Sequence, residues 1–259
     1  MSRRRFFAAG FGAAAATILP AGRAGAGLAP ARYLIVNADD LGMSAEIDQG
    51  LFEAHDRGIV TSASLLVDSP DAEAAVEQAR KRPRLGLGIH VAFDTRGKYF
   101  TDMKDLAAVQ QQIDRQLAAF VRLVGSPPDH IDSHHHMHLL FNVAHLFLAA
   151  GRRYNVPVRG FSEVVFVGRF WGQPEFGKTD MSKISVEVMV SMLRAIPAGF
   201  TEVSCHPGHL ETRPDALYNR EREVELATLT DERVRNTITE EGIRLINYHD
   251  YARMSREAR

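Results

Sequence analysis

Carboxylate and imidazole side chains recur in this 259-residue sequence at or just after short apolar segments. These are the side chains with which proteins bind divalent cations and transfer protons near neutral pH. If the apolar segments are parallel strands, their carboxyl ends meet at one edge of a sheet, where barrel enzymes assemble their active sites. The residues concerned are Asp39 and Asp40, His90, Asp132 with His134, and His206.

The adjacent pair Asp39 and Asp40 follows the apolar segment 33–36. On an extended backbone, neighbouring side chains point in different directions, so one carboxylate can hold a metal ion while the other handles protons. A structural alternative exists, because aspartate at a turn from strand to helix readily caps the helix. The pair taken alone does not decide between the two interpretations.

Histidines supply the other positions that could do chemistry. His90 lies in an otherwise apolar segment, where a lone histidine can equally be a core residue with satisfied hydrogen bonds. His134 opens a dense group of imidazoles, which favours a metal site because neutral imidazole is the commonest metal ligand. This group consists of His134, His135, His136 and His138.

His206 stands between Cys205 and a Pro-Gly pair, at the end of the apolar segment 200–205. We expect its imidazole to face the site as a positioned acid, although a tight Pro-Gly turn with an incidental histidine is the structural alternative. Cys205 is the single cysteine, which excludes an intrachain disulfide. Its place at the end of an apolar strand predicts a small buried hydrophobic residue and not a nucleophile.

The segments that must position these residues alternate between strand and helix patterns. Apolar β-rich runs predict strands, and apolar residues at helical spacing predict helices. This alternation is typical of a parallel sheet, either a barrel or a doubly wound sheet. The predicted strands are 33–36, 61–67, 85–91, 130–133, 156–159, 200–205 and 243–247. The predicted helices are 44–57, 71–80, 106–124, 143–154, 184–196 and 231–241.

The composition is that of a soluble globular protein, with 45% hydrophobic and 24% charged residues. A net charge of -1 provides no basic excess, so nucleic acid is not an expected partner. We find no internal repeat and no long low-complexity linker in the sequence. Residues 32–259 are therefore predicted to form a single domain.

Residues 1–26 have the pattern of a secretory signal. Arginines at positions 3–5 precede an uncharged alanine-rich stretch, and residues 24–26 (AGA) suit a signal peptidase. The apolar stretch is shorter than the roughly 20 residues that span a bilayer, so no integral membrane segment is expected in the mature chain. We predict export, to the periplasm or beyond, by a twin-arginine-type signal; a frayed basic tail is the alternative.

Taken together, the motifs resemble those of the YdjC-like carbohydrate deacetylase family. The resemblance includes residues 37–42 (NADDLG), 88–90 (GIH), 130–138 (HIDSHHHMH) and 205–208 (CHPG), and it extends over residues 33–251. It implies an α/β fold with a barrel-like parallel sheet surrounded by helices, a distorted TIM-type barrel. The departures from the family pattern are apolar for apolar, at Leu41 and Val91.

The resemblance also implies a role for each motif residue. Asp40, His90 and His134 would hold one divalent metal ion, with Asp39 as the general base and His206 as the general acid. The implied reaction removes an acetyl group from an N-acetylated sugar through a metal-activated water. The resemblance also allows a homodimer, for which these motifs predict no interface.

Other residues are expected to support this site. Asp132, with His136 or His138, would bind the free N–H of a ligating imidazole, as such ligands usually require. One carboxylate with two imidazoles suits Zn²⁺, whereas Mg²⁺ usually prefers oxygen; the family has been described with either metal, so both stay open. The single tryptophan, Trp171, lies in an aromatic segment that either stacks on a sugar ring or packs in the core.

Two other functions remain as alternatives. A metal-dependent hydrolase of another bond, such as a phosphoester, would be favoured by clustered arginine or lysine, and none accompanies these motifs in the sequence. A non-catalytic carbohydrate-binding protein would be marked by loss of Asp39 or His206, and both are present. The identity of the acetylated sugar is not encoded in any motif that we recognise.

Overall fold

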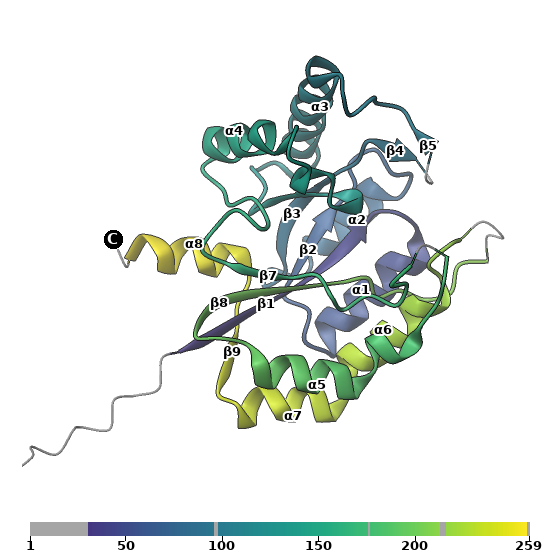
Figure 1. The fold of residues 1–259 in the computed structure, drawn as a ribbon, viewed down its shortest axis with the longest axis vertical. Helices are drawn as coiled ribbons and strands as arrows, with labels where there is room; N and C mark the ends of the chain where they lie inside the picture. The colour runs from purple at the N-terminus through teal and green to yellow at the C-terminus, as the bar shows by residue number, and fades with distance from the viewer. Residues whose placement is uncertain (1–30, 96–97, 176, 213–215, 258–259) are drawn as a thin grey trace, which may run out of the picture.

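The computed structural model describes residues 31–95, 98–175, 177–212 and 216–257. The predicted signal at residues 1–26 lies outside this described part of the chain. The described residues build one main parallel sheet with helices packed around it (Figure 1).

The main sheet has seven strands, and every ladder in it is parallel. Its order is β6-β3-β2-β1-β8-β7, and β9 pairs with β1 beside this path. Among the described residues no ladder joins β6 to β7, so the sheet is a curled half-barrel and not a closed barrel. The strands are β1 Arg32–Leu41, β2 Ser62–Leu65, β3 Gly86–Val91, β6 Ile131–Ser133, β7 Val165–Val167, β8 Gly199–Cys205 and β9 Ile243–Leu245.

The central strand β1 is buried on both faces, as its apolar sequence predicts. Leu34 and Val36 pack into the main core, which the surrounding helices complete. Ile35 points to the opposite face, into a smaller apolar cluster that includes Tyr248. Since side chains alternate along a strand, Asp39 continues the Ile35 face, and its carboxylate is directed to the inner side of the half-barrel.

Helices follow most strands, as the alternating pattern predicted. Figure 1 shows α3 and α4 at one side of the sheet and α5, α6 and α7 at the other. Within the described residues, no helix combines the length and apolar character needed to cross a membrane. The helices are α1 Ala45–Asp56, α2 Ala72–Ala79, α3 Leu106–Val124, α4 Ala144–Tyr154, α5 Val186–Ala195, α6 Arg220–Thr230, α7 Glu232–Glu240 and α8 Tyr248–Glu257. Two 3₁₀ helices, η1 His134–Leu139 and η2 Met181–Ile184, and a hairpin of β4 Asp94–Thr95 with β5 Lys98–Tyr99 complete the elements.

The predicted element order differs from the structure in several places, and it also lacked β7 and α8. The expected strand at 156–159 is reduced to one bridge between Val158 and Ile131, because Gly160 turns the chain with a φ of 74°. Helix α6 was not predicted, since charged residues in it face inward, so it lacks a clean apolar stripe. The predicted α/β class, a barrel-like parallel sheet surrounded by helices, is confirmed, and the sheet takes the form of a curled half-barrel.

Candidate metal centre and catalytic site

Asp39 and Asp40 lie inside the carboxyl end of β1 and not after it, which corrects the predicted strand boundary. The pairing of β1 with β2 shifts register between Ala38 and Leu41, and Asp40 has a left-handed backbone with a φ of 71°. A bulge of this kind re-aims a side chain that regular alternation would send to the other face. Both carboxylates are consequently buried at the same strand end.

The structure brings the three predicted metal ligands together. His90 lies in β3, and His134 begins the 3₁₀ helix η1 directly after β6. Oδ1 of Asp40 lies 3.1 Å from Nδ1 of His134 and 3.4 Å from Nε2 of His90. One ligand atom from each residue lies within 4.8 Å of the other two. Three different strand ends thus converge on one point.

This donor set fits a divalent cation. Ligands about 2.1 Å from a tetrahedral Zn²⁺ lie roughly 3.4 Å from one another, which is close to the observed spacing. Oδ1 of Asp40 is buried and accepts no hydrogen bond from the described residues, a costly state that a cation would relieve. Burial by itself lowers the pKa of His90, whereas the carboxylates of Asp132 and Asp39 raise it, so the surroundings favour positive charge.

Asp132 binds and orients His90, one of the predicted metal ligands. Its Oδ1 is 2.7 Å from Nδ1 of His90, which leaves Nε2 of His90 facing Asp40. Its Oδ2 accepts a hydrogen bond from the hydroxyl of Ser64 at 2.6 Å and pairs with Arg159 at 2.7 Å. The imidazole of His90 is thereby held in one orientation.

Arg159 is completely buried and binds three carboxylates. Its two terminal nitrogens donate to the two oxygens of Asp39 at 2.7 and 2.8 Å, and its Nε donates to Glu202 at 2.8 Å. The third partner is Asp132. Although burial raises the pKa of Asp39, the charge of Arg159 lowers it to about 2. Asp39 is therefore ionised throughout the physiological range.

Two further groups of potential ligands share members with the first group. In one of them Asp39 and Asp132 stand beside His90, but both carboxylates are already bound by Arg159, whose charge opposes a cation. The other group consists of Asp94, His134 and His135. In the group around Asp40, Oδ1 of Asp40 is buried and accepts no hydrogen bond from the described residues.

His206 directly follows β8 and lies beside Asp39. Its Nε2 is 3.8 Å from Oδ2 of Asp39, and its Nδ1 is 3.8 Å from Oε1 of Glu225. The backbone N–H of His206 also donates to Glu225, which anchors the turn on α6. The predicted base and the predicted acid are therefore neighbours at the site.

Trp171 belongs to the site, whereas the residue before it belongs to the core. Its indole stacks on the ring of Tyr218 with centroids 3.8 Å apart and meets the ring of His206 edge-on at 4.6 Å. Tyr218 in turn donates a hydrogen bond to Glu225 at 2.5 Å. Phe170 is fully buried, so the core interpretation applies to that residue, and stacking of Trp171 on a sugar ring stays a prediction.

The remaining histidines of the cluster have other surroundings. The described residues show no hydrogen bond from His136 or His138 to a candidate ligand, so the expected support from these two is not seen. His138 is buried and binds the hydroxyl of Ser133 at 2.7 Å, and burial lowers its pKa to about 3. Burial likewise lowers the pKa of His136 to about 4. Cys205 is buried and free, as predicted.

The sequence reasoning gave no site role to three charged residues that lie at the site. They are Arg159, Arg222 and Glu225. The interpretation that no arginine accompanies the motifs is wrong for the folded protein, because two arginines from distant segments of the chain reach the site. Both are bound to carboxylates, so they do not form a cluster available to a phosphate. The three-residue spacing of Arg222 and Glu225 on one face of α6 was the signal that could have located them.

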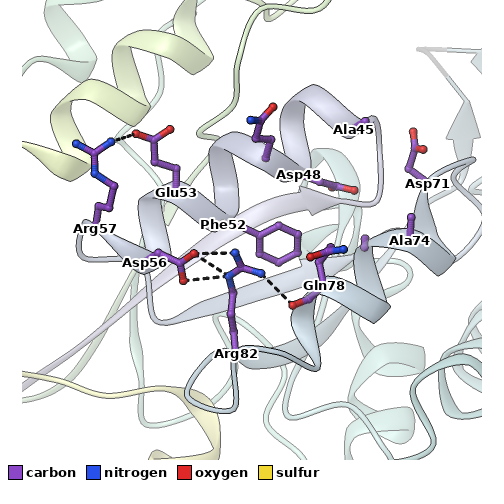
Figure 2. A pocket seen from close by; sticks show the side chains of 12 residues that line it. Ala45, Asp48, Phe52, Glu53, Asp56, Arg57, Asp71, Ala74, Gln78 and Arg82 are labelled. Carbon is purple, nitrogen blue, oxygen red and sulfur yellow. Dashed lines mark hydrogen bonds and ion pairs between the residues drawn. The ribbon is translucent and has the colours of Figure 1, made fainter.

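A surface groove of about 540 Å³ lies between α1 and α2 and is lined by none of the candidate ligands (Figure 2). Arg82 crosses it, over the ring of Phe52 at 4.3 Å and paired with Asp56. At one end Oδ1 of Asp48 accepts the N–H of Gly42 at 2.6 Å. Burial raises the pKa of Asp48 to about 7. Nothing in this groove indicates catalysis.

Fold and site together define an α/β half-barrel protein with a candidate metal centre flanked by a carboxylate and a histidine. The model of the family described as YdjC-like protein matches residues 33–240. The chain belongs to the YdjC-like family. A carbohydrate deacetylase of Geobacillus stearothermophilus is 33% identical, with 86% of this chain and 99% of that protein aligned. A chitooligosaccharide deacetylase of Proteus mirabilis is 30% identical, with 85% of this chain and 99% of that protein aligned.

Solved structures agree with this fold. A crystallised protein of Enterococcus faecalis V583, for which cellobiose-phosphate cleavage has been suggested, superposes with a TM-score of 0.74 at 28% identity. That match covers 85% of this chain and 99% of the other. A family 4 carbohydrate esterase from Streptomyces lividans gives a TM-score of 0.53 at 15% identity, covering 84% and 93% of the two chains. The second likeness supports the fold alone.

Proposed function

We propose that this protein is a metal-dependent carbohydrate deacetylase, which hydrolyses the acetamide of an N-acetylated sugar. The observation that carries the proposal is the convergence of Asp40, His90 and His134, with Asp39 and His206 beside them. The names of the relatives point to the same chemistry. The catalytic and ligand roles of the individual residues are part of this proposal.

The residues divide the work of amide hydrolysis. A divalent cation held by Asp40, His90 and His134 would acidify a water molecule and polarise the acetyl carbonyl. Asp39 accepts the proton of the attacking water, and Arg159 keeps that carboxylate ionised and in place. His206 gives a proton to the departing amine nitrogen, which is a poor leaving group without it.

The low pKa of Asp39 has a chemical consequence. A carboxylate with a pKa of about 2 is a weak base, so proton transfer to it is easier from a metal-acidified water than from bulk water. Asp39 is thus better suited to accept a proton from a metal-bound water than to act as a base without a metal.

The alternatives receive less support. Phosphoester hydrolysis calls for cationic groups free to bind a phosphate, whereas Arg159 and Arg222 are both bound to carboxylates. A binding protein without activity has no need of Asp39 and His206 at 3.8 Å from one another. A direct assay of acetate release distinguishes a deacetylase from both alternatives.

The test is release of acetate from N,N′-diacetylchitobiose by metal-free protein, with Zn²⁺, Co²⁺ or Mg²⁺ added back. Asp39→Asn should lower the rate by about 10²–10⁴-fold, the usual contribution of a general base, and Asp114→Asn should not. Asp114 is an exposed residue of α3 and serves as the matched control. If no acetate is released with any metal across a panel of N-acetylated glycans, the proposed activity is refuted. The most activating metal would identify the cofactor.

We further propose that the mature protein is exported through the predicted signal. The pattern of residues 1–26 is the support for this proposal. Cell fractionation of the full chain and of a variant with Arg3, Arg4 and Arg5 all replaced by Lys is the test. Equal export of the two chains would contradict a twin-arginine route.

A further inference from the structure

Arg222 binds the carboxylate of the candidate metal ligand Asp40. Its terminal nitrogen donates to Oδ2 of Asp40 at 2.6 Å, and both side chains are almost fully buried. Oδ1 of the same carboxylate faces His90 and His134 and accepts no hydrogen bond from the described residues. The two oxygens of Asp40 therefore have separate partners, a guanidinium on one side and the candidate cation position on the other.

The other donors of Arg222 hold it in this position. Its Nε donates to the carbonyl of Tyr218 at 3.1 Å, and its second terminal nitrogen donates to the carbonyl of His206 at 3.4 Å. The N–H of Gly208 donates to the carbonyl of Arg222 at 3.3 Å. The guanidinium is thus fixed between the metal ligand and the turn that carries the predicted acid.

We propose that Arg222 is a positioning residue of the metal centre, which restricts Asp40 to a single metal-binding oxygen. Its hydrogen bond occupies Oδ2, so the carboxylate offers the cation Oδ1 alone. It also draws electron density from the carboxylate, which weakens that oxygen as a donor. Both effects would leave a bound cation with more of its charge uncompensated, as activation of a water molecule requires.

The alternative role of Arg222 is to neutralise a buried acid for the sake of the fold. Burying a carboxylate without a partner is costly, so loss of Arg222 is expected to lower stability in either case. Stability alone therefore cannot separate the two roles. The number of oxygens that Asp40 gives to the cation can, because it changes the coordination of the metal itself.

The experiment uses the Co²⁺-loaded protein and measures its visible absorption spectrum and its metal dissociation constant by chelator competition. Arg222→Gln should lower the cobalt absorptivity, since a second carboxylate oxygen raises the coordination number. It should also tighten cobalt binding by about tenfold, because a nearby positive charge is removed. Arg222→Lys, which keeps the charge with fewer hydrogen bonds, should fall between Gln and the wild type.

Arg220→Gln is the control, as Arg220 is an exposed residue on the same helix. A wild-type spectrum in Arg222→Gln, with unchanged or weaker binding, would overturn the positioning role. Such a result leaves acetate release by the wild type untouched, so the proposed function would still stand. If the Gln variant does not fold, the Lys variant must show the spectral change for the inference to survive.

Discussion

The two adjacent aspartates at the end of β1 have different electrostatic surroundings. Asp39 is bound on both oxygens by Arg159, whereas Asp40 is bound on one oxygen by Arg222 and its other oxygen accepts no hydrogen bond from the described residues. The left-handed backbone at Asp40 makes this division possible, because it brings neighbouring side chains to one site. The sequence reasoning assigned separate roles to the two carboxylates, which stay predictions, but it could not foresee the bulge.

A prediction at the scale of the residue concerns His206. His206→Gln should lower kcat for acetate release by about 10²–10⁴-fold, since the departing amine loses its proton donor. The metal content should stay that of the wild type, because His206 lies beside Asp39 and outside the candidate ligand group. Rate measurements with metal analysis of the same samples provide the check. A variant that loses its metal would show that His206 is a ligand instead.

At the scale of the element, the sequence predicted what local patterns determine. The helix expected at 106–124 coincides with α3, which begins at the cap Asp105 and ends at the left-handed Gly125. Helix α6 escaped prediction because its inward face carries Arg222 and Glu225, whose partners come from β1 and the turn after β8. Such a face is recognised as internal only when the tertiary partners are known.

A second prediction concerns α1, which carries Asp48 in its first turn. Burial raises the pKa of Asp48 from 3.8 to about 7, so the folded protein binds more protons than the unfolded chain between these values. Stability should therefore fall as pH rises from 4 to 7. Asp48→Asn keeps an oxygen for the N–H of Gly42 and removes the titration, so it should stabilise the fold by about 2 kcal/mol at pH 8.

Urea unfolding of the wild type and Asp48→Asn at pH 4.5 and pH 8 measures this difference. The gain in free energy of unfolding should be present at pH 8 and small at pH 4.5. Asp250→Asn, a change at a more exposed aspartate of α8, is the control. Equal gains at the two pH values would refute a burial-raised pKa for Asp48.

At the scale of the whole molecule, a parallel half-barrel collects the ends of its strands at one edge. The candidate ligands belong to β1, β3 and the residue after β6, and the predicted acid follows β8. The ligands converge only in the folded chain, because they are spread from residue 40 to residue 134. Family-type motifs in the sequence indicated this convergence, but the contacts of Arg159 with three strands could not be deduced from spacing.

A third prediction follows from that convergence. A ligand that binds only the folded state stabilises it by about 2.7 kcal/mol when its concentration is 100 times its dissociation constant. Adding Zn²⁺ or Mg²⁺ to chelator-treated protein should therefore raise the melting temperature in a concentration-dependent way. Asp40→Asn should lose most of this rise in a thermal shift assay. A rise of equal size in Asp40→Asn would place the cation elsewhere.

The threefold contact of Arg159 constrains the order in which the chain can fold. Its partners lie on β1, β6 and β8, and Asp39 and Glu202 are 120 and 43 residues away along the sequence. A buried arginine is tolerated only when its carboxylates are present, and contacts between distant segments form slowly. The inner side of the half-barrel therefore closes only after Glu202 has been synthesised. We expect a nascent chain that ends before β8 to remain without its native core, however complete its first strands and helices are.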